Sequence, residues 1–224
     1  MRAALRFDPP QDGPSNMAAD EALLSEAREG AILARIYSWS SVWVSLGRNR
    51  TEITEALSRE GVQTVVRPTG GAAVLHGEDW TVALALPVPP GYRRLKPLYV
   101  LLTEPIVTAL VGCGLRACLA GDAARISDSP DCFAARAALD VVDSWTGQKL
   151  CGCAMAVRDG AALLQASIPR RDAPENLRRL LGGDPPEEEL EWSDGTFPEV
   201  FASAFASWLP AARQFTAGWN VPRV

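Results

Sequence analysis

The dipeptide Asp159-Gly160 lies between two long stretches rich in apolar residues, and it is the strongest local folding signal in this chain. Aspartate followed by glycine favours the tight turn of a β-hairpin, because both residues tolerate positive φ angles. The sequence therefore predicts two antiparallel strands, at residues 148–158 and 161–168, joined by this turn.

The last clear element is an amphipathic helix near the C-terminus. Thr196 and Glu199 have the spacing of a capping box, which predicts the helix start. Apolar residues then recur at helical spacing, and they are Phe197, Val200, Phe201, Ala204, Phe205 and Trp208. This pattern predicts a helix that packs on the core.

The remaining elements follow from apolar periodicity and from proline and glycine punctuation. We expect an edge strand and a Pro-rich loop over residues 1–14, and a helix from Met17, capped by Ser15 or Asn16 and ended by Gly30. Further strands are expected at residues 32–39, 42–46, 63–67, 80–88, 115–119 and 139–142. Further helices are expected at residues 52–59, at 97–112 with a kink or break at Pro105, and within 174–194, beside an acidic loop.

Strands joined by both hairpins and helices predict an α+β fold, with a mixed, largely antiparallel sheet flanked by helices. The chain shows no low-complexity linker and no repeat, so we expect one domain over residues 1–224, in which residues 175–224 form a C-terminal helical segment.

The net charge of −5 gives no overall attraction to nucleic acids or membrane surfaces. No apolar run reaches the roughly 18–20 residues that span a bilayer, and the N-terminus is too polar for a secretion signal. We therefore expect a cytoplasmic protein without nucleic-acid or membrane partners. The odd count of five cysteines suits no disulfide framework, so free thiols are expected.

Lys149 is one of only two lysines among 22 basic residues. Because arginine otherwise supplies the positive charge, a retained lysine indicates a need for the compact ammonium group. Lys96 lies in an ordinary polar loop and fits the alternative, survival without a special role. Alternation along the predicted strand places Lys149, Cys151 and Cys153 on one face.

The stretch at residues 67–77 combines a Gly-rich turn with the only histidine of the chain, His76. Gly70 and Gly71 permit a backbone approach that a side chain would block, so the turn could hold a phosphate, a carbonyl or an acyl chain. The spacing fits neither the phosphate loop nor the dinucleotide fingerprint. A lone histidine after an apolar run is more often a hydrogen-bonded structural group, and this alternative stays open for His76.

Cys132 differs from the other four thiols because it lies in a polar loop, between Asp131 and Phe133. A loop thiol beside a cation has a lowered pKa and is a candidate nucleophile. Cys151 and Cys153 could begin a metal site, but with one histidine and no second spaced pair no metal site is expected.

Four segments resemble motifs of the lipoate–protein ligase and octanoyltransferase family, whose members are related to biotin–protein ligase. The resemblance extends over residues 15–170. The segments are residues 16–24, residues 44–49, residues 67–77, which resemble Arg-Arg-x-Thr-Gly-Gly-Gly-x-Val-x-His, and residues 147–154, which resemble Gly-x-Lys-(Ile/Val)-x-Gly-Ser-Ala. This chain departs from the family at Val66, Ala72, Met155-Ala156 and Gln165-Ala166.

The resemblance implies the biotin/lipoate ligase catalytic-domain fold, with an acyl chain in a tunnel beside the Gly-rich turn. It implies that Lys149 contacts the acyl carbonyl or carboxylate end. The segment at 130–133 resembles the part of ligase-like octanoyltransferases that holds the nucleophile, which implies that Cys132 is catalytic. The substrate-binding residues that it implies are Arg67, Thr69, Gly70, Gly71, Ala72, His76 and Gly152.

Three functions remain open from the sequence. The first is an octanoyl- or lipoyl-transferase that takes the acyl group from acyl carrier protein through a cysteine thioester and passes it to a lipoyl domain or to glycine-cleavage H protein, with no cofactor. The second is an ATP-dependent lipoate–protein ligase, which requires ATP and magnesium. The third is a non-catalytic member that binds an acyl ligand or a carrier domain.

Overall fold

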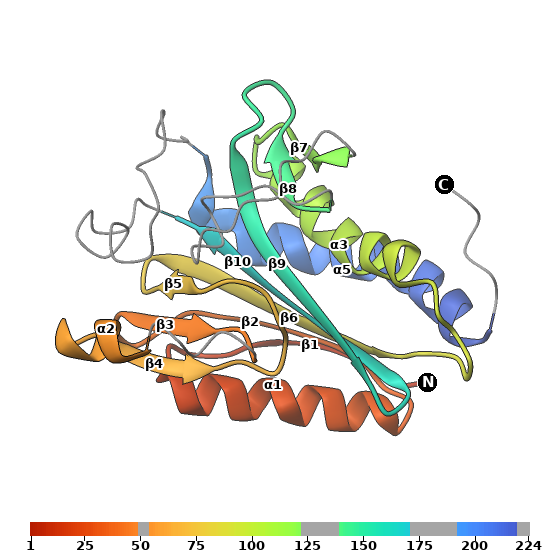
Figure 1. Ribbon diagram of the computed structural model, residues 1–224. Helices are drawn as coiled ribbons and strands as arrows, with labels where there is room; N and C mark the ends of the chain where they lie inside the picture. Colours follow the sequence, from red (N-terminus) through yellow and green to blue (C-terminus); the bar gives the residue numbers. More distant parts are fainter. Residues whose placement is uncertain (49–53, 122–138, 171–191, 219–224) are drawn as a thin grey trace.

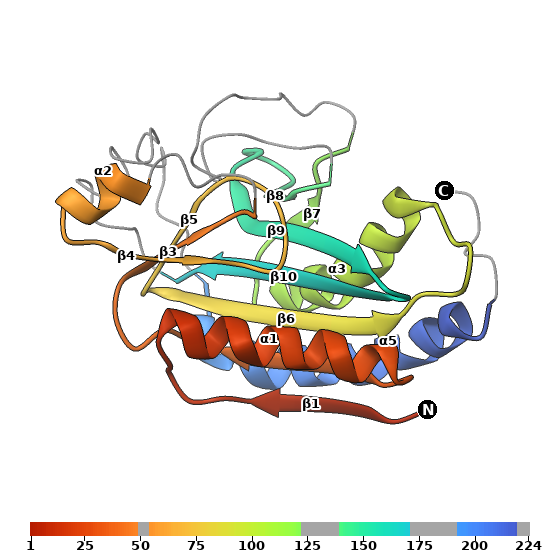
Figure 2. The same cartoon turned by 60° about the horizontal axis from the view of Figure 1, so that its bottom comes forward.

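The computed structural model describes residues 1–48, 54–121, 139–170 and 192–218. A seven-stranded sheet lies between helix α1 on one face and helices α3 and α5 on the other, as Figures 1 and 2 show. The strands, in their order across the sheet, are β1 (Ala3–Phe7), β2 (Ile32–Tyr37), β6 (Asp79–Pro87), β10 (Ala161–Pro169), β9 (Lys149–Arg158), β8 (Val141–Asp143) and β7 (Ala117–Leu119).

The sheet is mixed and mostly antiparallel, as the sequence predicts. Edge strand β1 runs parallel to β2, and the other neighbouring pairs are antiparallel. The hairpin of β9 and β10 forms at the predicted turn, where Asp159 has φ 51° and Gly160 has φ 79°. Both residues therefore occupy the left-handed region that this turn requires.

A smaller sheet packs beside one end of the large one (Figure 1). It has the order β4 (Gln63–Val66), β3 (Trp43–Leu46) and β5 (Val74–His76), with β3 parallel to β4 and antiparallel to β5. Helix α2 (Thr54–Arg59) precedes β4 in the chain, and its Leu57 is buried in an apolar cluster with Val44 and Leu46. The Gly-rich turn connects β4 to β5, so this small sheet positions it.

Helix α1 (Gly13–Arg28) begins four residues earlier than the sequence pattern predicts. Asp12 is the N-cap, and its carboxylate accepts a hydrogen bond from the Ser15 amide at 2.8 Å. The prediction of Ser15 or Asn16 as the cap is therefore wrong, because Pro14 fits the first turn of a helix and extends it. The predicted stop at Gly30 is confirmed by its φ of 97°.

Helix α3 (Leu95–Gly112) continues through Pro105, so the proline does not split it. Proline has no N–H, and the carbonyl of Leu101, four residues earlier, is left without its helical partner. The indole Nε1 of Trp208 donates to this carbonyl at 2.8 Å. Trp208 belongs to helix α5 (Phe197–Thr216). The carbonyl that Pro105 leaves without a helical partner therefore accepts a hydrogen bond from α5 and links the two helices.

Helix α5 presents the predicted apolar stripe, and Phe197, Phe201 and Phe205 are buried against the sheet and α3. The predicted capping box is wrong, because the Thr196 hydroxyl makes no cap hydrogen bond and instead donates to the Ser193 carbonyl. Most of the expected short helix and acidic loop within 174–194, and the expected polar loop that holds Cys132, lie outside the described residues.

Among the described residues, α3 is the one helix that is long and apolar enough to cross a membrane. Its apolar side chains are used inside the protein, since Leu98, Leu102, Ile106 and Leu110 are fully buried in the main core. The high hydropathy of α3 is therefore explained by its packing against the sheet and against α5.

Candidate active site

A pocket of about 340 Å³, part of it open to solvent, lies between the small sheet and strands β9 and β10. Residues from helix α1, from strands of both sheets and from adjoining loops line it. They are Met17, Tyr37, Trp39, Ser45, Arg67, Val74, His76, Thr81, Gly152, Cys153, Ala154, Gln165, Ala166 and Ser167. The pocket therefore brings together the Gly-rich stretch and the strand that carries Lys149, two segments that the sequence separates by about seventy residues.

Arg67 holds the shape of the Gly-rich turn from inside the protein. Its guanidinium group donates to the Gly70 carbonyl at 2.6 and 3.1 Å and to the Ala72 carbonyl at 2.6 Å. A third contact, to the Ser45 carbonyl at 2.9 Å, ties the turn to β3. Because these acceptors surround the guanidinium, Arg67 acts as a scaffold for the backbone of the turn.

The turn also depends on glycine at two positions. Gly71 has φ 93°, a conformation that residues with a side chain rarely adopt. A Cβ added at Gly47, on the loop after β3, would lie 2.0 Å from the Gly71 carbonyl oxygen. The backbones of the two segments therefore approach each other more closely than any other residue would allow.

His76 is held from both sides at the pocket wall. Its Nδ1 lies 2.8 Å from the Asp79 carboxylate, and its Nε2 lies 2.8 Å from the Ser45 hydroxyl. The ring of Trp39 stacks on the imidazole, with 4.0 Å between the ring centroids. The Asp79 carboxylate can only accept a hydrogen bond, so Nδ1–H donates to it, and Nε2 is left to accept a hydrogen bond from the Ser45 hydroxyl.

Asp79 is buried, yet its carboxylate has four hydrogen-bond donors. Besides His76, these are the Gly77 amide at 3.1 Å, the Thr81 hydroxyl at 2.9 Å and the Ser167 hydroxyl at 2.8 Å. Burial alone would raise the pKa of Asp79, but the interaction with His76 and the other hydrogen bonds lower it below its usual value. Asp79 is therefore a fixed negative charge beneath the imidazole.

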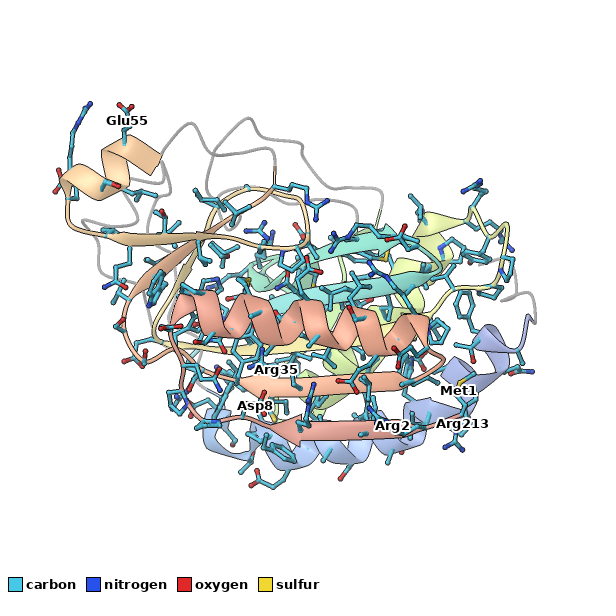
Figure 3. The ribbon with its side chains drawn as sticks, turned by 90° about the horizontal axis from the view of Figure 1, so that it is seen from below. Met1, Arg2, Asp8, Arg35, Glu55 and Arg213 are labelled. Atoms are coloured by element: carbon cyan, nitrogen blue, oxygen red, sulfur yellow. The ribbon has the colours of Figure 1, made fainter. Side chains whose placement is uncertain are left out.

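A second buried polar cluster joins α1 to β2, and Figure 3 shows Arg35 and Asp8, two of its members, below α1. Arg35 donates to Asp20 at 2.7 Å and to Asp8 at 2.5 Å, and the Tyr37 hydroxyl donates to Asp20 at 2.8 Å. Burial raises the pKa of Asp20, although Arg35 opposes this shift. Burial and the Asp20 charge raise the pKa of Tyr37 well above its ordinary value.

Gln165 links this cluster to the Gly-rich turn. Its amide nitrogen donates to Asp20 at 2.5 Å, and its amide oxygen accepts from the Thr69 hydroxyl at 2.7 Å. Gln165 is one of the residues at which this chain departs from the resembled motifs, and its hydrogen bonds give it a structural role here. Thr69 reaches the pocket through Gln165 and does not itself line it.

The structure brings several of the expected site residues together. Arg67, His76 and Gly152 line the pocket, and the Gly71 backbone lies against Ala154, since an added Cβ at Gly71 would be 3.8 Å from the Ala154 Cβ. Gly70 and Ala72 are connected to the pocket because their carbonyl oxygens accept hydrogen bonds from Arg67, which lines it. Sequence reasoning missed Ser45 and Asp79, for which the three-residue spacing from His76 to Asp79 was the one available signal.

Lys149 lies on the same strand as Gly152 but does not line the pocket. Its ammonium group lies 2.8 Å from the Asp140 carboxylate, and both side chains are nearly inaccessible to solvent. Cys132 lies outside the described residues, so its position relative to Lys149 stays a prediction.

Cys151 and Cys153 share one face of β9, as predicted, with 3.4 Å between their sulfur atoms. Burial and the neighbouring Cys153 raise the pKa of Cys151 well above its ordinary value, which disfavours its thiolate. Within the described ranges, no group of three or more histidine, cysteine or acidic side chains could hold a metal ion.

Comparison with known families and proteins gives a consistent result. The family described as lipoyl protein ligase A/B catalytic domain matches residues 12–196 of this chain. The octanoyltransferase LipM of Carboxydothermus hydrogenoformans is 33% identical over 180 residues, which cover 75% of this chain and 65% of that relative. The octanoyltransferase LipM of an Exiguobacterium species is 31% identical over 169 residues, which cover 69% of this chain and 60% of that relative.

This chain therefore spans less than two thirds of the length of these two relatives. Among solved structures, a putative lipoate protein ligase from T. acidophilum with bound lipoic acid is similar, with a TM-score of 0.71. The likeness covers 94% of this chain and 87% of that one at 19% identity. It confirms the α+β fold with a mixed sheet flanked by helices that the sequence predicts.

Proposed function

This chain belongs to the lipoyl protein ligase A/B catalytic-domain family, and on that premise we propose that it is an acyltransferase. The proposed reaction moves an octanoyl or lipoyl group from acyl carrier protein to a lysine of a lipoyl-carrier domain or of glycine-cleavage H protein. Relatives named octanoyltransferase favour octanoyl over lipoyl and favour transfer over ATP-dependent ligation.

The observation that carries this proposal is the hydrogen bonding of the pocket. Its polar side chains are already paired within the protein: Ser45 with His76, Thr81 and Ser167 with Asp79, and Gln165 with Asp20. Met17, Trp39 and Val74 supply apolar wall. A saturated acyl chain can therefore enter without leaving a buried polar group unsatisfied, which is the condition for binding such a chain.

The charged groups of the pocket also favour acyl transfer over ATP-dependent ligation. Arg67, the cation that lines the described part of the pocket, bonds to carbonyl oxygens of the turn. While the turn keeps this shape, those N–H groups are engaged with the backbone and are not available to a triphosphate. A thioester donor needs no such group, because it is already activated and requires neither ATP nor metal.

In the proposed first step, the Cys132 thiolate attacks the carbonyl carbon of the acyl thioester. The bond between that carbon and the carrier sulfur breaks, and the carrier leaves as a thiolate, which takes up the proton that Cys132 gave up. Lys149 is the proposed source of positive charge for the oxyanion and for the Cys132 thiolate, and this role requires its ammonium to reach from the Asp140 contact toward the pocket. In the second step, the acceptor lysine displaces Cys132 and forms an amide.

The test is transfer between purified proteins, followed by intact mass spectrometry of the acceptor. Octanoyl-acyl carrier protein and a lipoyl domain should yield an octanoylated domain without ATP, and Cys132→Ser should abolish the product. Cys118→Ser is the matched control, because Cys118 lies on β7 and does not line the pocket, and it should transfer normally.

Two other outcomes would replace this proposal. Modification that occurs only with free octanoate or lipoate, ATP and magnesium would identify a ligase, the alternative that the same family contains. Tight binding of the lipoyl domain with no transfer under either condition would identify a non-catalytic binding protein.

A further inference from the structure

Three side chains at the pocket wall form a continuous hydrogen-bonded chain that the proposed steps leave without a role. Ser45 lies 2.8 Å from His76 Nε2, and Asp79 lies 2.8 Å from His76 Nδ1. These are the distances that join a hydroxyl, a base and an orienting carboxylate in proton-transfer sites. Ser45 and His76 line the pocket, and Asp79 lies behind them.

The chain of contacts is rigid and directional. Asp79 is held by Gly77, Thr81 and Ser167, so it cannot turn away from the imidazole. Trp39 fixes the plane of the ring by stacking on it. The fixed tautomer leaves Nε2 as the proton acceptor, and a proton can pass from the Ser45 hydroxyl to Nε2 without any side chain moving.

The proposed transfer needs such an acceptor in its second step. The acceptor lysine has an unperturbed pKa of about 10.4, so it arrives as an ammonium ion that cannot attack a thioester. Arg67 cannot accept a proton at any ordinary pH. His76 is the one imidazole of the chain, and it already lies in the pocket.

We propose that Ser45, His76 and Asp79 form a proton relay that deprotonates the acceptor amine. This role rests on the proposed acyl transfer and deepens it. The ammonium gives one proton to Ser45 Oγ as the Ser45 hydroxyl proton moves to His76 Nε2, and Asp79 stabilises the imidazolium that forms. The neutral amine then attacks the thioester carbonyl.

The rest of the step balances without a further reactant. As the carbon–sulfur bond breaks, the second amine proton goes to the departing Cys132 thiolate, and the third remains on the amide nitrogen. His76 returns its proton to solvent before the next turnover. No electron transfer or co-reactant is required.

Charged and titratable groups surround the imidazole of His76. They are Asp79 on β6, Arg67 through Ser45 on β3, and Tyr37 on β2 at the same pocket. Asp79 is the one of these groups that bonds directly to the imidazole, so it stabilises the imidazolium that the relay forms.

The test compares two amines in their attack on enzyme that has first been acylated. The first is a lipoyl domain, whose lysine needs deprotonation, and the second is hydroxylamine, a much weaker base that is already neutral near neutral pH. Ser45→Ala should slow deacylation by the lipoyl domain by roughly 100-fold, a typical effect for a lost acid–base group, and should change the hydroxylamine rate less than about twofold.

Thr103→Ala is the matched control, because Thr103 is a fully buried hydroxyl on α3 that bonds to its own helix and does not line the pocket. It should leave both rates unchanged. His76→Gln is the second variant, and it should reproduce the selective loss.

Equal slowing of both amines in Ser45→Ala and His76→Gln would show a structural role and overturn the relay, as would no slowing at all. A variant that no longer takes up the acyl group would have the same meaning. If the unaltered protein forms no acyl-enzyme, the proposed transfer itself is wrong, and that result differs from every outcome that tests the relay.

Discussion

Two buried carboxylates, Asp79 and Asp20, lie beside the pocket, and each is hydrogen-bonded to several partners. Asp79 carries a lowered pKa because His76 and three other donors bond to it, and Asp20 is contacted by Arg35, Tyr37 and Gln165. A buried carboxylate stays ionised only where such donors outweigh the cost of burial. The pKa values of the two carboxyl groups shift in opposite directions: the pKa of Asp79 is lowered, whereas burial raises that of Asp20.

Asp79 should make the stability of the protein depend on pH. Its pKa in the folded protein lies below the unfolded value of 3.8, so its contribution is present above about pH 4 and is lost as the pH falls through the lower folded pKa. At about pH 6, Asp79→Asn should lower the free energy of unfolding by about 1–3 kcal/mol, the usual cost of unsatisfied buried groups.

Urea unfolding of both proteins between about pH 3 and pH 6 checks this prediction. The difference between the two free energies should shrink toward the acid end, because a protonated Asp79 resembles the asparagine. A difference that stays constant over this range would mean that Asp79 does not titrate below its unfolded value.

Single residues were predictable from the sequence where their type was unusual. The only histidine, a scarce lysine and a glycine pair directed attention to the correct segments, and His76 lies at the pocket. Ser45 was not predictable, because it meets His76 only through the pairing of β3 with β5. In that pairing Ser45 lies opposite Val74, and His76 follows two residues later on β5. Local periodicity carries no information about that pairing.

Helices and strands were predicted more reliably than their ends and contacts. The β9–β10 hairpin and the stripe of α5 follow from local patterns, and both are present. The start of α1 was missed, because Asp12 and Pro14 looked like part of a loop. The docking of α5 on α3 depends on the carbonyl that Pro105 leaves free, and a contact between residues 101 and 208 leaves no local sequence signal.

Gly47→Ala tests whether close backbone approach shapes the Gly-rich turn. The added Cβ would overlap the Gly71 carbonyl, so the turn must shift, and we expect a loss of about 2–3 kcal/mol of stability, as for other overpacked sites. Gly70→Ala is the control, because a Cβ at Gly70 meets no atom within 4 Å and its φ is not positive. It should change stability by less than about 0.5 kcal/mol in thermal or urea unfolding.

Equal stability of Gly47→Ala and Gly70→Ala would contradict the proposed close approach. The more sensitive measurement is acyl transfer by Gly47→Ala, because a displaced turn alters the pocket even where the fold survives. We expect transfer to fall by more than about tenfold.

Trp208→Phe tests the contact between α3 and α5. The phenyl ring keeps most of the apolar area but leaves the Leu101 carbonyl without a donor, so we expect a loss of about 1–3 kcal/mol in urea unfolding. Trp145→Phe makes the same exchange at a side chain that is 82% exposed, and it should cost less than about 0.5 kcal/mol. Similar losses for the two variants would contradict the role of the Trp208 hydrogen bond.

At the scale of the whole molecule, the pocket exists because two sheets meet. The small sheet brings the Gly-rich turn and His76, and the large sheet brings Gly152 and Asp79 (Figures 1 and 2). The fold class followed from the alternation of elements, but the strand order β1-β2-β6-β10-β9-β8-β7 did not, because it is determined by long-range packing. The sequence therefore reveals the motifs that form this site, but it does not reveal that the two sheets bring them together.

The most direct test is intact mass spectrometry of this protein after it is mixed with octanoyl-acyl carrier protein in the absence of ATP. One octanoyl adduct is expected, present in the Cys118→Ser protein and lost in Cys132→Ser. An unmodified mass, or an adduct that persists in Cys132→Ser, would contradict acyl transfer through Cys132.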